Sequence, residues 1–115
     1  MVRFLILVIA VAAGCARPDS NASTTPTQEM LQGQRVYENV CAACHAQGLD
    51  GAPAIGDRED WTSRFELWVA VLEEHAKEGY LAMPAKGGDP SLSDQEVTAA
   101  VEYMLTQTLP DRRTE

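Results

Sequence analysis

Apolar side chains recur every three to four residues in three parts of the chain, which is the spacing of one helix face. The face of the first part, over 28–40, consists of Met30, Gly33, Tyr37 and Val40. The face of the second, over 63–78, consists of Phe65, Val69, Leu72 and Ala76. The face of the third, which follows Ser93, consists of Val97, Ala100, Val101, Met104 and Leu105. This pattern predicts an all-α fold, and no internal repeat interrupts it.

Capping residues fix the expected helix ends. Thr27 is able to cap the first helix, and Ser93 with Glu96 forms the S-x-x-E capping box of the last. Pro110 ends the last helix, so we expect 110–115 to be a frayed C-terminal tail.

A glycine inside the first helix needs a reason, because Gly costs about 1 kcal/mol relative to Ala there. We expect another helix to approach closely at Gly33, with Tyr103 and Met104 of the last helix as the crossing residues.

The first fourteen residues have the pattern of an export signal. Arg3 precedes an apolar run over 4–13, which is too short to span a bilayer comfortably. Small residues followed by Cys15 resemble a bacterial lipoprotein cleavage box, in which the cysteine becomes the lipid-bearing N-terminus. Ordinary signal cleavage nearby is the alternative. Either interpretation places the mature protein on the periplasmic side of a bacterial membrane, anchored through Cys15 in the first case and soluble in the second.

Turn-forming residues dominate 15–27, which predicts a flexible linker between the anchor and a single domain over 28–109. A linker of this length has a mean reach of roughly 20 Å, so the domain would swing near the membrane.

The whole chain has 115 residues and a formal net charge of −8. Such acidity argues against nucleic acid, whose phosphates would repel the protein, and it permits a basic protein partner. Aromatic residues make up only 6% of the chain, so the apolar core is thin unless a large apolar group completes it.

The candidate chemistry lies in Cys41-Ala42-Ala43-Cys44-His45, which reads C-x-x-C-H, the attachment signature of a c-type haem. Two thiols at this spacing form thioethers to one porphyrin edge, and His45 then lies under the iron. Three alternatives remain: a thioredoxin-like dithiol, which lacks the surrounding strand–helix–strand pattern; a zinc site with His75 as fourth ligand; and a structural disulfide.

Gly33, Tyr37 and Cys41 together resemble the class I cytochromes c, where a glycine and an aromatic residue precede the haem motif and meet the C-terminal helix. Further motifs resemble the cytochrome c5 group of short bacterial carriers. They are Gly51-Ala52-Pro53, Gly56-Asp57, Trp61, Arg64, His75-Ala76, Met83-Pro84-Ala85-Lys86-Gly87-Gly88 and Leu92-Ser93-Asp94. The resemblance covers roughly 30–109. The extra cysteine pair that some c5 members carry near the methionine loop is absent from this sequence.

The resemblance implies a fold of about four helices around one covalent haem c, held by Cys41 and Cys44. It implies His45 and Met83 as axial iron ligands, and the carbonyl of Pro53 as acceptor for the His45 Nδ1–H. Pro53 as simple turn punctuation is equally compatible with the sequence. The competitors for the sixth position are Met30, Met104, His75 and the two lysines, Lys77 and Lys86.

Trp61 and Arg64 enter the second helix with polar groups that suit haem propionates. The alternative is that Trp61 fills the core and Arg64 is a surface charge.

An iron with both axial positions filled has no vacant site for oxygen or peroxide, which favours electron transfer over catalysis. The expected function is therefore a membrane-tethered monohaem carrier of a respiratory or related periplasmic chain. It would exchange electrons with transient protein partners and have no small-molecule substrate. Two alternatives remain: a haem enzyme or gas-binding site with a labile sixth ligand, and an electron-entry subunit of a larger oxidoreductase.

Overall fold

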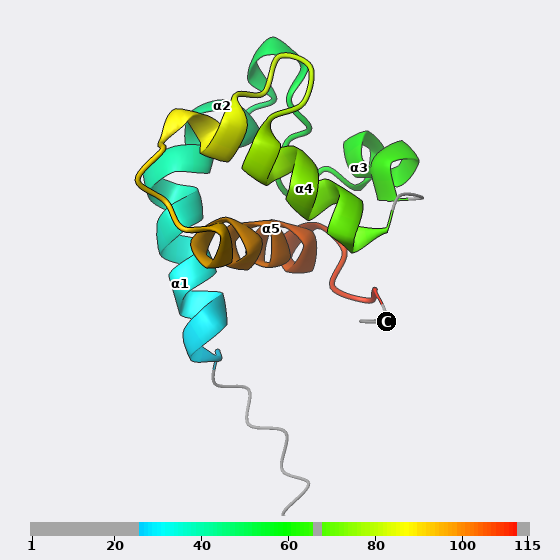
Figure 1. Cartoon of the computed structure of the whole chain (residues 1–115). Helices are drawn as coiled ribbons and strands as arrows, with labels where there is room; N and C mark the ends of the chain where they lie inside the picture. Colours follow the sequence, from blue (N-terminus) through cyan, green and yellow to red (C-terminus); the bar gives the residue numbers. More distant parts are fainter. Residues whose placement is uncertain (1–25, 66–67, 113–115) are drawn as a thin grey trace, which may run out of the picture.

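The computed structural model describes residues 26–65 and 68–112, and within these it is helical (Figure 1). Helix α1 spans Gln28–Val36 and continues through a π-helical turn, η1 (Tyr37–Cys41), into the short helix α2 (Ala42–His45). The expected cap is confirmed, because Thr27 Oγ1 accepts a hydrogen bond from the Met30 N–H at 3.2 Å. The helical path runs past the expected end at residue 40 and carries the C-x-x-C-H motif on its last turns.

The expected single helix over 63–78 is wrong, because the structure has two helices there. Helix α3 spans Arg58–Phe65 and helix α4 spans Val69–Glu78. Helix α3 begins before the expected start at residue 63, because Asp57 caps it. The Asp57 Oδ1 accepts hydrogen bonds from the N–H groups of Glu59 at 3.0 Å and Asp60 at 3.3 Å. Trp68, with φ −62° and ψ 144°, is extended and separates the two helices.

Helix α5 spans Asp94–Thr108, as its cap predicted. The Ser93 Oγ accepts from the Glu96 N–H at 3.3 Å, and the Glu96 Oε2 accepts from the Ser93 N–H at 2.9 Å, which completes the capping box. The predicted apolar face is confirmed: four of its members are buried, and Val101 packs against the core.

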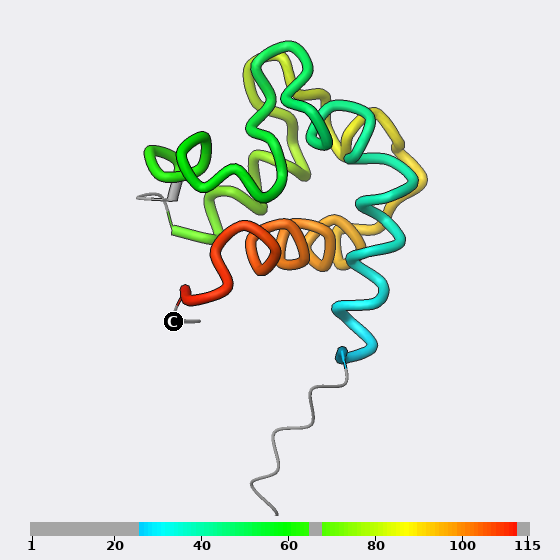
Figure 2. Tube along the Cα trace, turned by 180° about the vertical axis from the view of Figure 1, so that it is seen from behind, coloured from blue at the N-terminus to red at the C-terminus, as the bar shows by residue number. Residues whose placement is uncertain are grey.

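Helices α1 and α5 cross at Gly33, and both views show α5 lying across α1 (Figures 1 and 2). A Cβ added to Gly33 would lie 2.0 Å from the Ala99 carbonyl oxygen and 3.0 Å from the Tyr103 Cβ. The close approach is therefore confirmed, with Tyr103 as one crossing residue. Met104 instead belongs to the buried core, together with Tyr37, Trp61 and Leu105.

The expected frayed tail is held more firmly than predicted where the structure describes it. The Arg112 guanidinium pairs with the Glu102 carboxylate of α5, and the Arg112 side chain is only 5% exposed. Asp111 pairs with Arg58 of α3 at 3.6 Å. These contacts hold the chain after Pro110 against two helices as far as Arg112.

Two short 3-10 turns, η2 (Leu49–Gly51) and η3 (Ala85–Gly88), lie in the loops on either side of α3 and α4. Across the described ranges, none of the helices has the length and apolar character that a membrane crossing requires. The expected signal over 1–14 and the anchor at Cys15 lie outside the described residues, as does nearly all of the expected linker.

Candidate metal centre

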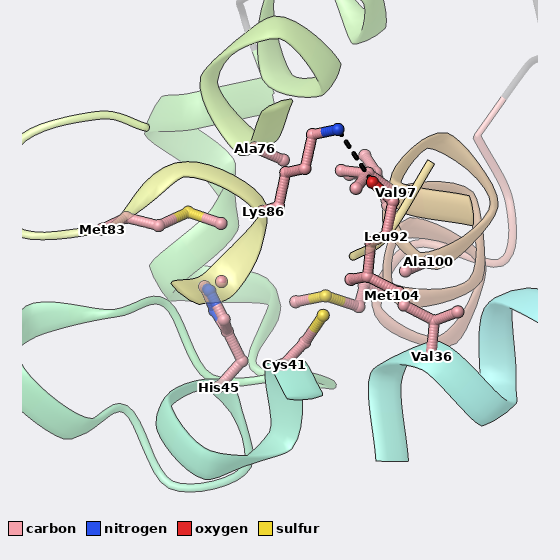
Figure 3. Close-up of a pocket in the computed structure, with 12 residues that line it drawn as sticks. Val36, Cys41, His45, Ala76, Met83, Lys86, Leu92, Val97, Ala100 and Met104 are labelled. Carbon is pink, nitrogen blue, oxygen red and sulfur yellow. Dashed lines mark hydrogen bonds between the residues drawn. The ribbon is translucent and has the colours of Figure 1, made fainter. Parts of the chain in front are cut away.

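An apolar cleft lies between the C-x-x-C-H turn, helix α4, the loop over 79–90 and helix α5 (Figure 3). It encloses about 320 Å3 of free space, counting the part that opens to solvent. Its lining consists of Val36, Cys41, His45, Ala76, Met83, Lys86, Gly87, Leu92, Val97, Ala100, Val101 and Met104. The cleft therefore combines a hydrocarbon surface with one imidazole, one thiol and two thioethers.

His45 is buried at the base of this cleft, with 8% of its surface exposed. Its Nδ1 lies 2.8 Å from the Pro53 carbonyl oxygen. Because a carbonyl oxygen only accepts, Nδ1 carries the hydrogen and donates it, which leaves the Nε2 lone pair free to bind a metal. The Ile55 N–H also donates to the His45 carbonyl at 2.7 Å. The 46–57 loop therefore holds both the imidazole ring and the backbone carbonyl of His45.

Cys41 and Cys44 lie three residues apart on the helical turns that end at His45, and both thiols are partly buried. Burial raises the pKa of the Cys41 thiol, so it stays protonated near neutral pH. In this structure the two sulfurs are not joined in a disulfide. The zinc alternative does not fit, because the described residues contain no group of three or more His, Cys, Asp or Glu side chains able to hold a metal ion.

Met83 reaches the cleft from the loop after α4, and in Figure 3 its sulfur lies across the cleft from Cys41 and above His45. The backbones of Met83 and Tyr80 form two hydrogen bonds with each other. The Tyr80 N–H donates to the Met83 carbonyl at 2.9 Å, and the Met83 N–H donates to the Tyr80 carbonyl at 2.9 Å. This tight turn fixes the side of the cleft from which Met83 enters.

The competitors for the position facing His45 divide into two groups. Met30 and His75 are not among the residues that line the cleft, and the His75 ring is stacked on Tyr80. Met104 and Lys86 do line it. Lys86 is engaged elsewhere, since its Nζ donates to the Leu92 carbonyl at 2.8 Å, as Figure 3 shows, and pairs with Asp94 at 3.0 Å.

Lys77 lies outside this cleft lining, and its ammonium pairs with Glu74 at 3.1 Å and Glu73 at 3.9 Å.

Trp61 is buried and its indole N–H donates to the Ala54 carbonyl at 2.8 Å. An indole has a single N–H, so this bond favours the core-packing alternative. Arg64 is partly exposed and its guanidinium donates to the Asp60 carbonyl of its own helix. The propionate role of both residues stays a prediction.

Sequence reasoning missed Tyr80, whose place three residues before Met83 and directly after Gly79 was the available signal. Gly79 has φ +86°, and a Cβ there would lie 2.9 Å from the Ala85 nitrogen. This glycine lets the chain fold back on itself immediately before the Met83 turn.

The donor set fits a covalently attached iron porphyrin. Two thiols three residues apart would form the two thioether bonds, an imidazole nitrogen and a methionine sulfur are donors that would bind iron, and the cleft is hydrocarbon-lined. Comparison with known proteins agrees: residues 28–104 match the sequence profile of the family described as cytochrome C oxidase, cbb3-type, subunit III. The chain belongs to this family of cytochrome c domains.

Relatives that bear other names share most of their length with this chain. A cytochrome c-555 from Prosthecochloris aestuarii is 39% identical over 89 residues, which are 70% of this chain and 90% of that protein. A cytochrome c5 from Azotobacter vinelandii is 36% identical over 74 residues, covering 63% of this chain and 89% of the relative. The expected likeness to the c5 group is thereby confirmed.

Solved structures confirm the expected fold. One is a chain from the crystal structure of an electron transfer complex of nitrite reductase with cytochrome c, with a TM-score of 0.63 and 31% identity. The match covers 67% of this chain and 94% of that chain. A second is the reduced cytochrome c551 of Ectothiorhodospira halophila, with a TM-score of 0.55, 34% identity, and coverage of 65% and 97%. The protein is thus a small class I cytochrome c with one covalent haem c.

Proposed function

We propose that this cytochrome is a one-electron carrier whose iron is ligated by His45 and Met83. The single observation that supports this most strongly is that His45 and Met83 both line one apolar cleft, 38 residues apart in the sequence. A bound haem c would supply a one-electron ferric/ferrous couple. With His45 and Met83 both bound to it, the iron would have no open position for a substrate, and this favours a carrier over a haem enzyme.

Each residue has a distinct task in this proposal. Cys41 and Cys44 hold the porphyrin edge, and the Pro53 carbonyl orients His45 and strengthens it as a donor. Met83 supplies a soft sulfur ligand that favours ferrous iron and so raises the reduction potential. The hydrocarbon lining keeps water away from the metal and limits the solvent rearrangement that accompanies a change of charge.

The ligand assignment is tested with carbon monoxide, which binds ferrous iron only at an open position. We expect the ferrous wild-type protein to leave carbon monoxide unbound and Met83→Ala to bind it, as seen in the absorption spectrum. Met104→Leu is the matched control: it removes the other thioether of the cleft at similar volume and should behave as wild type.

If the wild-type protein bound carbon monoxide readily, the carrier proposal would fail and the labile-ligand enzyme would replace it. If Met104→Leu opened the site and Met83→Ala did not, the ligand would be Met104.

We further propose that the mature protein is tethered on the periplasmic side of a membrane through lipid on Cys15. Support comes from the signal-like sequence before Cys15 and from its thiol, the one cysteine of three outside the haem motif. Cys15→Ser should release the protein from membranes in cell fractionation while leaving the haem spectrum unchanged. Retention of that variant would exclude the lipid anchor.

Transient redox proteins are the proposed partners. The similar chain from the electron transfer complex of nitrite reductase with cytochrome c supports this class of partner. The alternative of a fixed electron-entry subunit predicts that a stoichiometric partner co-purifies with the native protein.

A further inference from the structure

A pair of stacked rings joins the last turn of α4 to the start of the loop that carries Met83. The His75 ring on the last turn of α4 and the Tyr80 ring are nearly parallel, 7° apart, with centroids separated by 3.9 Å. Neither residue lines the cleft. The stack therefore acts outside the metal centre, at the point where the loop leaves the helix.

Tyr80 connects this stack to Met83. Both backbone hydrogen bonds of the tight turn run between Tyr80 and Met83, each at 2.9 Å. Tyr80 is thus held on one side by the ring of His75 and on the other by the backbone of Met83. Movement of Met83 away from the cleft that opens this turn breaks both of its bonds to the Tyr80 backbone, which couples the position of Met83 to that of Tyr80.

The rest of the loop supplies little else that would hold Tyr80. Tyr80 is 51% exposed, and the next residue, Leu81, is 89% exposed. Leu81 also has φ +52°, a conformation that costs an L-residue energy. The exposed, strained tip of the turn is joined to the rest of the protein on one side through Tyr80. Further along the loop it is joined through Lys86, which binds the Leu92 carbonyl and Asp94.

We propose that His75 and Tyr80 are positioning residues for Met83: their stack holds the loop closed and so keeps the sulfur on the iron. This inference rests on the proposed ligation by Met83. It assigns His75 a role different from that of a sixth ligand, because His75 would act through Tyr80 and never touch the metal.

An aromatic pair of this kind changes an equilibrium constant by a factor of about 2 to 12. Removing either ring should therefore raise the population with Met83 displaced by about 2- to 12-fold. Because cyanide binds ferric iron only when Met83 is displaced, the apparent cyanide affinity of the ferric holoprotein should rise by the same factor.

The experiment compares His75→Ala, Tyr80→Ala and the double variant in a cyanide titration of ferric holoprotein. Because the two rings act as one unit, the double variant should gain no more affinity than either single variant. Tyr80→Phe keeps the ring and should behave as wild type. Trp68→Ala removes an 82% exposed aromatic side chain just before α4, away from the stack, and should have no effect.

A second readout separates this inference from the proposed ligation. The charge-transfer absorption of thioether-ligated ferric haem should be present in wild type and weaker in the two alanine variants. Wild-type protein without that absorption would overturn the Met83 assignment and the inference together. Wild-type protein with it, and alanine variants with unchanged cyanide affinity, would overturn the stacking role alone. Strictly additive effects in the double variant would also overturn it, since independent residues give that result.

Discussion

At the scale of single residues, three non-glycine residues in the described part of the chain have a positive φ, and all three lie in the loops around the cleft. They are Asp50 at φ 53°, Leu81 at φ 52° and Lys86 at φ 54°. Strain of this kind persists only where the surrounding structure holds it. For Lys86 the holding contacts are visible, since its ammonium is bound by the Leu92 carbonyl and Asp94.

Leu81 is held through the backbone alone: the two Tyr80–Met83 hydrogen bonds close the turn around it, while the residue itself is 89% exposed. Asparagine tolerates this backbone conformation better than leucine does, so Leu81→Asn should raise the free energy of unfolding by up to about 1 kcal/mol. Denaturant titration of the holoprotein measures the change.

Leu49→Asn is the matched control for that measurement, because Leu49 is also an exposed leucine, at 55%, but lies outside the positive-φ set. Equal gains from both variants would show that removing exposed apolar surface, and not backbone strain, accounts for the change.

At the scale of elements, the crossing of α1 and α5 depends on the absence of a side chain at Gly33. Gly33→Ala should lower the free energy of unfolding by about 1–3 kcal/mol, because the new methyl group would push the Ala99 carbonyl away. This loss should appear even though alanine is the better helix former by about 1 kcal/mol. The midpoint of denaturant unfolding of the holoprotein is the measurement.

Gly51→Ala is the comparison for the free energy of unfolding, because it adds the same methyl group without a clash. A Cβ at Gly51 meets no atom within 4 Å, and only the positive φ opposes it. A Gly33→Ala protein as stable as wild type would show that the two helices do not depend on this contact.

The elements that the sequence predicted well are those with a local signal. The S-x-x-E cap located α5 at its observed start, and the spacing of its apolar residues identified its buried face. The break between α3 and α4 was missed, because the apolar spacing continues from Phe65 to Val69 as though one helix ran through it. The early start of α3 was missed separately: Asp57 lies in a loop-forming stretch, and the structure shows its role as cap through its bonds to the Glu59 and Asp60 N–H groups.

The candidate site divides in the same way. Cys41, Cys44, His45 and Pro53 lie within thirteen residues of one another, so a sequence motif describes them, and the His45–Pro53 contact is present. Tyr80 and His75 meet because the chain reverses after Gly79. No periodic pattern in a sequence predicts a stack between the end of a helix and a turn. The hydrogen bond from Lys86 to the Leu92 carbonyl likewise depends on how a loop folds, so the sequence did not predict it.

At the scale of the whole molecule, the chain carries a formal net charge of −8, while its two lysines are already paired with carboxylates. The last turns of α4, which border the Met83 loop, add Glu73, Glu74 and Glu78 to this negative field. Such a field attracts positively charged redox partners and repels negatively charged ones before any contact forms.

Salt should therefore act in opposite directions on two classes of partner. Electron exchange with a cationic metal complex should slow as salt rises from about 0.01 M to about 1 M, over which the Debye length falls from about 30 Å to about 3 Å. Exchange with an anionic complex should accelerate over the same range. Stopped-flow rates of holoprotein oxidation and reduction measure both, and Glu74→Gln should reduce the two slopes together. Reversed slopes, with the cationic complex accelerating and the anionic complex slowing as salt rises, would mean that positive charge near the haem edge, and not the net charge of the chain, governs the approach of partners.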